Sequence, residues 1–165
     1  MSGWYVLQVA TGREQEIERR LRRIGIDAIV STETLLIHKG GRWTPKESLL
    51  FPGYVFVQIL FDPDIYYRIT DIPGVIRFLP GPQAEKLSDQ EAAHIAYLGS
   101  AVLGPSLVDF SNGEPVILKG VLKSLEKQIV RFNRRQRRAT LSTDFLGASH
   151  TFTLSFTEPG QGVST

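Results

Sequence analysis

Arginine side chains cluster near the end of the 165-residue chain, with five of them between Arg131 and Arg138. The guanidinium group is planar, permanently charged and able to donate paired hydrogen bonds, which suits phosphates and the faces or edges of bases. Apolar residues alternate on both sides of residues 133–136, so the arginines are expected at the tip of a β-hairpin. Like charges at this density repel one another unless an anion binds. The segment therefore predicts contact with nucleic acid, and a solvated loop is the alternative.

The net charge of +2 is unevenly distributed along the chain. Residues 1–98 carry 11 basic and 12 acidic side chains, and residues 99–112 add one acidic side chain. Residues 113–165 carry 8 basic against 4 acidic side chains, a net charge of +4. This asymmetry indicates an anionic partner for the C-terminal third.

A second group of arginines lies on the first expected helix. Glu16 and Glu18 stand four residues before Arg20 and Arg22, a spacing that pairs opposite charges along a helix. Two interpretations of the other arginines stay open, a solvated helix face and a further contact with nucleic acid. The arginines without such a helical partner are Arg13, Arg19 and Arg23.

No residue pattern in the chain is typical of catalysis or of metal binding. The chain has no cysteine, which excludes disulfides, Cys-ligated metals and a thiol nucleophile. His38, His94 and His150 lack the spacing of a metal-binding helix, and no glycine pattern matches a phosphate-binding or dinucleotide-binding loop. Ser124 lacks the flanking glycines of a hydrolase nucleophile. The sequence predicts a binding protein that is no enzyme and needs no cofactor.

Neither a targeting signal nor a membrane span is expected. The alternating run Trp4–Val9 has no basic segment before it and is too short for a signal peptide. No window approaches the roughly 18–20 apolar residues that a spanning helix requires. We therefore expect a cytoplasmic protein without membrane contact, and a monomer.

The pattern of residues 1–98 predicts mixed strands and helices. Helices are expected after Thr11, Asp62 and Ser88, where Thr11–Glu14 and Ser88–Glu91 have the spacing of capping boxes. A hairpin turn is expected at Lys39-Gly40-Gly41. The expected strands cover residues 4–9, 27–32, 34–38, 42–50, 54–61 and 75–79.

The remaining residues predict a linker and a small barrel. Residues 99–112 show no stable periodicity and contain Gly104-Pro105, which is typical of a linker. Short strands at roughly ten-residue spacing follow, a pattern typical of a small antiparallel barrel. They cover residues 115–119, 128–132, 138–143 and 150–156. The predicted domains are therefore 1–98 and 113–165, joined by the linker 99–112.

Aromatic residues are abundant in the N-terminal half. In a strand, Tyr54 and Phe56 share one face while Val55 and Val57 take the other. If helices cover only one face of the sheet, the other face presents an apolar patch suited to a protein partner. Packing in the core is the alternative for each of these residues.

Three motifs stand out along the chain: Trp4-Tyr5-Val6, the segment Leu50–Val57 (LFPGYVFV) and Pro73-Gly74-Val75. Their order and spacing resemble those of the NusG family of transcription elongation factors. The chain resembles this family over essentially its whole length. The resemblance implies an α+β fold class: an N-terminal NusG-type domain, with an antiparallel sheet and three helices, plus a small all-β SH3-like KOW barrel.

Residues 122–139 resemble LoaP, a specialised branch of that family that promotes processive antitermination of long biosynthetic operons. The matching segments are Leu122–Glu126, Ile129-Val130, Asn133–Arg135 and Arg138-Ala139. LoaP-like proteins are thought to bind a leader RNA hairpin through the KOW domain, with DNA as an alternative ligand. The resemblance then implies that nucleic acid is contacted by Lys123, Lys127, Arg131, Arg134, Arg135, Arg137 and Arg138.

The family resemblance also implies RNA polymerase as a partner. NusG-type domains dock an apolar face on the β′ clamp helices and reach towards the β subunit. By motif match, Tyr54 and Phe56 belong to that face, with Phe78 and Tyr97 as weaker candidates. Tyr66, Tyr67 and Arg68 align with the contact on the β side.

The chain departs from the KOW pattern at two frequent glycines, which are Ser124 and Lys127 here. A remodelled first barrel turn is expected, which weakens the case for binding Rho or a ribosomal protein. The alternatives are a general NusG factor that couples polymerase to Rho or the ribosome and, in another class, an autonomous RNA-binding module. The β-branched composition argues against refolding of the C-terminal domain as a helical hairpin, as in the RfaH relative.

Overall fold

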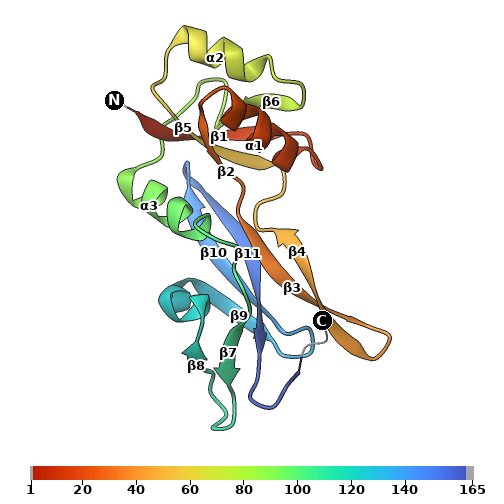
Figure 1. Ribbon diagram of the computed structural model, residues 1–165. Helices are drawn as coiled ribbons and strands as arrows, with labels where there is room; N and C mark the ends of the chain where they lie inside the picture. Colours follow the sequence, from red (N-terminus) through yellow and green to blue (C-terminus); the bar gives the residue numbers. More distant parts are fainter. Residues whose placement is uncertain (1, 163–165) are drawn as a thin grey trace. The chain divides into compact units, whose positions relative to one another are not determined.

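The computed structural model describes residues 2–162, which form two compact units (Figure 1). The first unit comprises the residues up to Ser31, then Phe51–Ser100 and Phe145–Ala148. The second comprises Thr32–Leu50, Ala101–Asp144 and the residues from Ser149 onwards. Each unit thus combines segments that are far apart in the sequence. The domain boundaries expected near residues 98 and 113 follow from the sequence alone and stay a prediction.

The first unit contains a four-stranded antiparallel sheet with three helices, as expected from the sequence. The strand order is β2-β5-β1-β6, and β1 pairs with β5 from Gly3↔Ile59 to Gln8↔Tyr54. The strands are β1 (Gly3–Val9), β2 (Asp27–Ile29), β5 (Tyr54–Ile59) and β6 (Val75–Phe78), and the helices are α1 (Glu14–Arg23), α2 (Pro63–Thr70) and α3 (Asp89–Leu98). None of the described helices is long and apolar enough to cross a bilayer.

One face of this sheet carries the main core of the first unit. Ile17 and Leu21 of α1 and Ile69 of α2 are fully buried in it. They pack with the strand residues that alternate onto the same face, among them Val55 and Val57. Burial of this apolar stripe is what holds short helices of eight to ten residues on the sheet.

The two expected capping boxes differ in outcome. The one at α3 is confirmed, since Ser88 Oγ accepts from Glu91 N at 3.1 Å and Ser88 N donates to Glu91 Oε1 at 2.8 Å. The one at α1 is wrong, because no side chain caps this helix. The buried carboxylate of Glu14 instead accepts from Gly12 N and from Gly53 N, each at 2.7 Å. Gly53 lies just before β5 with φ +86°, a left-handed conformation that glycine adopts readily, and its N–H points to the Glu14 carboxylate.

The second unit contains a five-stranded sheet that curls into a half-barrel of the KOW type, confirming the expected fold class. Its order is β8-β7-β11-β10-β9, where β7 pairs parallel with β11 and antiparallel with β8. The strands are β7 (Ser106–Asp109), β8 (Val116–Lys119), β9 (Ile129–Asn133), β10 (Arg138–Phe145) and β11 (Ala148–Thr157).

Two elements of the second unit were not expected. Strand β7 lies inside the segment taken as a linker, where Ser106 and Val108 are fully buried. Four residues are too few to show an alternation that stands out in the sequence. The 3₁₀ helix η1 (Val121–Gln128) precedes β9 and buries Leu122 and Leu125 at the position of the remodelled turn.

The expected hairpin around Gly40-Gly41 is confirmed and belongs to the second unit. Its strands are β3 (Thr32–Lys39) and β4 (Arg42–Leu49), and both glycines have positive φ. Ser155 of β11 binds β3 twice: its Oγ accepts from Leu36 N at 2.9 Å and its N donates to Glu33 Oε1 at 3.1 Å. The strand expected over 27–32 is interrupted, since β2 ends at Ile29 and β3 begins at Thr32.

Candidate nucleic-acid interface

The arginine-rich segment forms a turn between β9 and β10, as expected. We call residues Asn133–Arg138 the arginine turn. Asn133 Oδ1 accepts from Gln136 N at 3.0 Å, which closes the turn locally. Arg137 has φ +55°, a left-handed conformation that is uncommon for a residue with a side chain. Its N donates to Arg134 O at 3.3 Å, and its carbonyl accepts from Phe156 N at 2.9 Å. The backbone of the turn is therefore well constrained.

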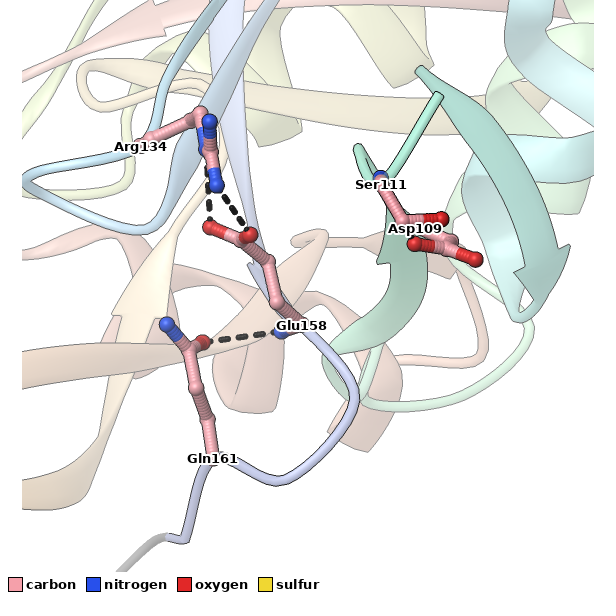
Figure 2. A network of polar contacts seen from close by, with 5 residues as sticks. All are labelled: Asp109, Ser111, Arg134, Glu158 and Gln161. Atoms are coloured by element: carbon pink, nitrogen blue, oxygen red, sulfur yellow. Dashed lines mark hydrogen bonds and ion pairs between the residues drawn. The ribbon is translucent and has the colours of Figure 1, made fainter. Parts of the chain in front are cut away.

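Arg134 is held by an ion pair within the second unit. Its Nε donates to Glu158 Oε2 at 3.0 Å and its Nη2 to Glu158 Oε1 at 2.5 Å, a bidentate arrangement (Figure 2). The guanidinium also lies 4.6 Å from the centre of the Phe110 ring. Glu158 N donates to Gln161 Oε1 at 2.8 Å, and this hydrogen bond fixes the backbone of Glu158. Part of the positive charge of the turn is thus neutralised by the chain itself.

Arg137 is buried rather than exposed, with 9% of its surface accessible. Its guanidinium lies 4.2 Å from the centre of the Trp43 ring, and its Nη1 donates to Gly162 O at 3.1 Å. Trp43 in turn stacks on His38, with ring centres 4.9 Å apart and planes 21° from parallel. Burial lowers the pKa of Arg137, but a guanidinium stays charged at physiological pH. Arg137 therefore joins the turn to the β3–β4 hairpin.

Arg138 faces a buried carboxylate on β3. Its positive charge lowers the pKa of Glu33, but burial outweighs this effect and raises that pKa from 4.5 to about 7. The Nε of Arg138 is itself shielded from solvent and has no hydrogen-bond partner among the described residues. Buried donors without a hydrogen-bond partner are rare in proteins, so an acceptor near Arg138 Nε would be favourable.

The other basic residues expected to bind nucleic acid are exposed. Arg131 lies on β9, Arg135 on the turn, and Lys123 and Lys127 on η1, which directly precedes β9. No ion pair joins any of these four to another described residue. These four exposed cations are therefore available to an external anion.

The arginines of α1 lie in the first unit and are mostly paired. The expected pairs are confirmed, with Arg20 and Glu16 joined at 3.7 Å and Arg22 and Glu18 at 3.7 Å. Arg13 was expected to lack a helical partner, but its Nη2 lies 2.9 Å from Glu16 Oε2 because a spacing of three residues also brings side chains together. Arg19 and Arg23 are exposed.

The residues expected to dock on polymerase divide into buried and exposed groups. Phe56 is fully buried, with its ring centre 5.8 Å from that of Phe51 and 5.6 Å from that of Phe145. Tyr54 is half-buried and lies edge-on to Phe145 at 6.2 Å. The face that carries Phe56 is thus covered in this structure by Phe145.

The remaining residues lie on β6, α2 and α3. Phe78 is 3% exposed and stacks on half-buried Tyr66, with ring centres 5.5 Å apart. Tyr67 is 63% exposed, Tyr97 is 44% exposed, and Arg68 is also exposed. These last three are the exposed members of the set.

The described residues contain no group of three or more His, Cys, Asp or Glu side chains that could hold a metal ion. The chain combines an α+β unit with a half-barrel that carries a basic turn. The family model described as transcription termination factor nusG matches residues 2–96, and the chain belongs to this NusG family. It is therefore a transcription termination/antitermination factor and not an enzyme.

Curated relatives match nearly the whole chain. The transcription termination/antitermination protein NusG of Helicobacter pylori (strain ATCC 700392 / 26695) is 24% identical over 160 residues, covering 89% of this chain and 91% of the relative. The protein of the same name from Pseudomonas aeruginosa is 24% identical over 171 residues, covering 94% and 96%. A solved structure titled "Domain interaction in Thermotoga maritima NusG" shares the fold, with a TM-score of 0.50, 17% identity and 94% of each chain covered.

Proposed function

We propose that this NusG-family protein is a LoaP-type antitermination factor, which binds RNA polymerase through its first unit and an RNA hairpin through its second. The observation that carries the proposal is the arginine turn, where cations gather on a constrained backbone next to the exposed Arg131 of β9. The exposed Lys123 and Lys127 lie on η1, which precedes the same strand. A protein with this role acts in the cytoplasm as a monomer and needs neither cofactor nor metal.

The basic residues take two different roles in this proposal. Arg134 and Arg137 are bound to Glu158 and Trp43, so they set the shape of the turn. Arg131 and Arg135 are exposed and contact phosphates along the RNA backbone. The narrow major groove of an RNA helix limits direct reading of paired bases, so the shape of the turn and the unpaired nucleotides determine selectivity.

Polymerase binding begins with the exposed aromatic residues of the first unit. Tyr67 and Tyr97 present large, rigid side chains of the kind enriched at protein interfaces, and Arg68 lies next to Tyr67. Docking through Phe56 requires a further step, because Phe145 must first leave the ring that it covers. The Phe145–Ala148 segment would thus compete with polymerase for the same apolar face.

RNA binding by the full-length chain tests the first half of the proposal. The probes are RNA hairpins from leader sequences and duplex DNA of equal length, followed by fluorescence anisotropy. Replacing Arg131 and Arg135 by Ala should weaken hairpin binding and flatten the salt dependence of log K by roughly 0.7–0.9 per lost phosphate contact. The matched control replaces Arg77 and Lys86, two exposed cations of the first unit outside every predicted contact, by Ala. Equal losses in both double variants would contradict a site at the turn.

Polymerase capture tests the second half. Phe145→Ser should increase the amount of RNA polymerase retained by the immobilised protein, because it uncovers Phe56. Tyr67→Ala should decrease it without changing thermal stability, since Tyr67 is 63% exposed. If Phe145→Ser lowers capture while the protein stays folded, Phe56 is a core residue and not part of the docking face.

A further inference from the structure

The arginine turn and the β3–β4 hairpin enclose a hollow of about 280 Å³ within the second unit. His38, Trp43 and Leu36 line it from the hairpin, and Arg135, Gln136 and Arg138 line it from the turn. The volume lies just below the usual range of ligand pockets, roughly 300–1,000 Å³. It suits one planar group of the size of a nucleobase better than a larger ligand.

The wall formed by the hairpin is a stacking surface. Trp43 and His38 already lie nearly parallel, and the Arg137 guanidinium lies against the same indole. His38 is exposed and Trp43 is half-buried, so the stack borders on solvent at the hollow. Unpaired bases of RNA bind proteins by stacking on aromatic rings and on guanidinium planes. The hollow thus offers the kind of surface that an unstacked base requires.

The wall formed by the turn supplies polar groups of two kinds. Gln136 is exposed, and its Oε1 accepts from Asn133 Nδ2 at 3.3 Å, so its NH2 group can donate to the edge of a base. Arg135 and Arg138 bring positive charge to the rim, where the phosphates next to a splayed base would lie. The shielded Nε of Arg138, which lacks a partner, is a donor in a residue that lines the hollow.

We propose that this hollow binds one unpaired nucleobase of the RNA, stacked against Trp43 and His38, with Gln136 at its edge and Arg135 and Arg138 at the adjacent phosphates. The inference rests on the proposed function, because it assumes that RNA is held at the arginine turn. It adds that a bulged or looped nucleotide is read by the β3–β4 hairpin, outside the half-barrel. The protein would therefore distinguish hairpins by an unpaired base and not by charge alone.

The experiment compares two RNA hairpins with the same stem and the same tetraloop. One carries a single bulged 2-aminopurine, and in the other this nucleotide is paired with uridine. The full-length protein at low ionic strength should bind the bulged hairpin about tenfold more tightly, which is the order expected for one stacked base. The emission of the bulged 2-aminopurine should fall on binding, because stacking on an aromatic ring quenches it.

Variants assign the effect to the hollow. Trp43→Leu removes the π surface and should abolish both the tenfold preference and the quenching, while binding of the paired hairpin persists. Trp43→Phe keeps a ring and should retain part of the preference, and Gln136→Ala tests the base edge if Trp43→Leu fails to fold. The matched control is Lys86→Ala, which removes one exposed charge from the first unit outside every predicted contact and should leave the preference unchanged.

The outcomes separate this inference from the proposed function. Equal affinity of the native protein for both hairpins, without quenching, overturns the base-binding site while RNA binding by the turn stands. A preference that survives Trp43→Leu places the base elsewhere and also overturns it. Absence of binding to either hairpin at low ionic strength overturns both proposals.

Discussion

Glu33 gives the second unit a pH dependence that a single substitution should remove. The side chain is 2% exposed, and burial raises its pKa from 4.5 to about 7 although Ser155 N donates to Oε1 and Arg138 is nearby. Because the folded state binds this proton more tightly than the unfolded state, protonation favours folding. The stabilisation is fully present below pH 4.5, and it is lost as the pH rises to about 7.

The size of the effect follows from the shift in pKa. Each unit of pKa difference between the folded and unfolded states corresponds to about 1.4 kcal/mol. A pKa of about 7 instead of 4.5 therefore lowers the free energy of unfolding by roughly 3 kcal/mol between these two pH values. Glu33→Gln keeps the oxygen that accepts from Ser155 and carries no charge, so the variant should lack this contribution.

Urea unfolding from pH 4.5 to 8 measures the difference between the two proteins. Trp4→Phe in both leaves Trp43 as the only tryptophan, so that the fluorescence reports on the β3–β4 hairpin of the second unit. Titration of other carboxyl groups contributes equally to both proteins and cancels in the comparison. Glu33→Gln should gain roughly 3 kcal/mol relative to the native protein over this range. Parallel stability curves would refute the assignment of the raised pKa to Glu33.

Four further substitutions test contacts described above. Phe56→Ala should lower the free energy of unfolding by about 3–5 kcal/mol, as truncation of a fully buried ring does, whereas Tyr67→Ala should change it by less than about 0.5 kcal/mol in thermal melts. Glu14→Ala removes the acceptor of two partly buried backbone N–H groups and should cost about 2–3 kcal/mol in chemical denaturation; a value near zero would mean that water replaces the carboxylate. Glu158→Ala releases Arg134 and should steepen the salt dependence of RNA binding by roughly 0.7–0.9, with little loss of stability.

Local patterns in the sequence predicted the elements of this fold well. The alternation around residues 133–136 located the arginine turn, and the glycine pair at 40–41 located the β3–β4 hairpin. The spacing from Ser88 to Glu91 predicted the start of α3. In each case the residues that determine the structure are within a few positions of one another, so the sequence contains the whole signal.

The contacts that define the candidate site are distant in sequence and could not be predicted in this way. Arg137 contacts Trp43, and Glu33 accepts from Ser155 across 122 residues of chain. Periodicity in the sequence does not reveal such pairs, because each residue lies in a segment that has the pattern of an exposed hairpin or an edge strand. The role of Arg134 differs from expectation for the same reason, since its partner Glu158 lies 24 residues further along the chain.

The contacts of Glu158 and Gly162 with the arginine turn have a practical consequence for handling the protein. Arg134 is bound by the carboxylate of Glu158 and Arg137 by the carbonyl of Gly162, so residues just after β11 act as internal competitors for the two cations. Cleavage after Thr157 would leave the folded sheet intact but create a more basic and less rigid turn. A preparation clipped at that position would bind polyanions such as heparin more strongly than the full-length chain and elute later from such a column.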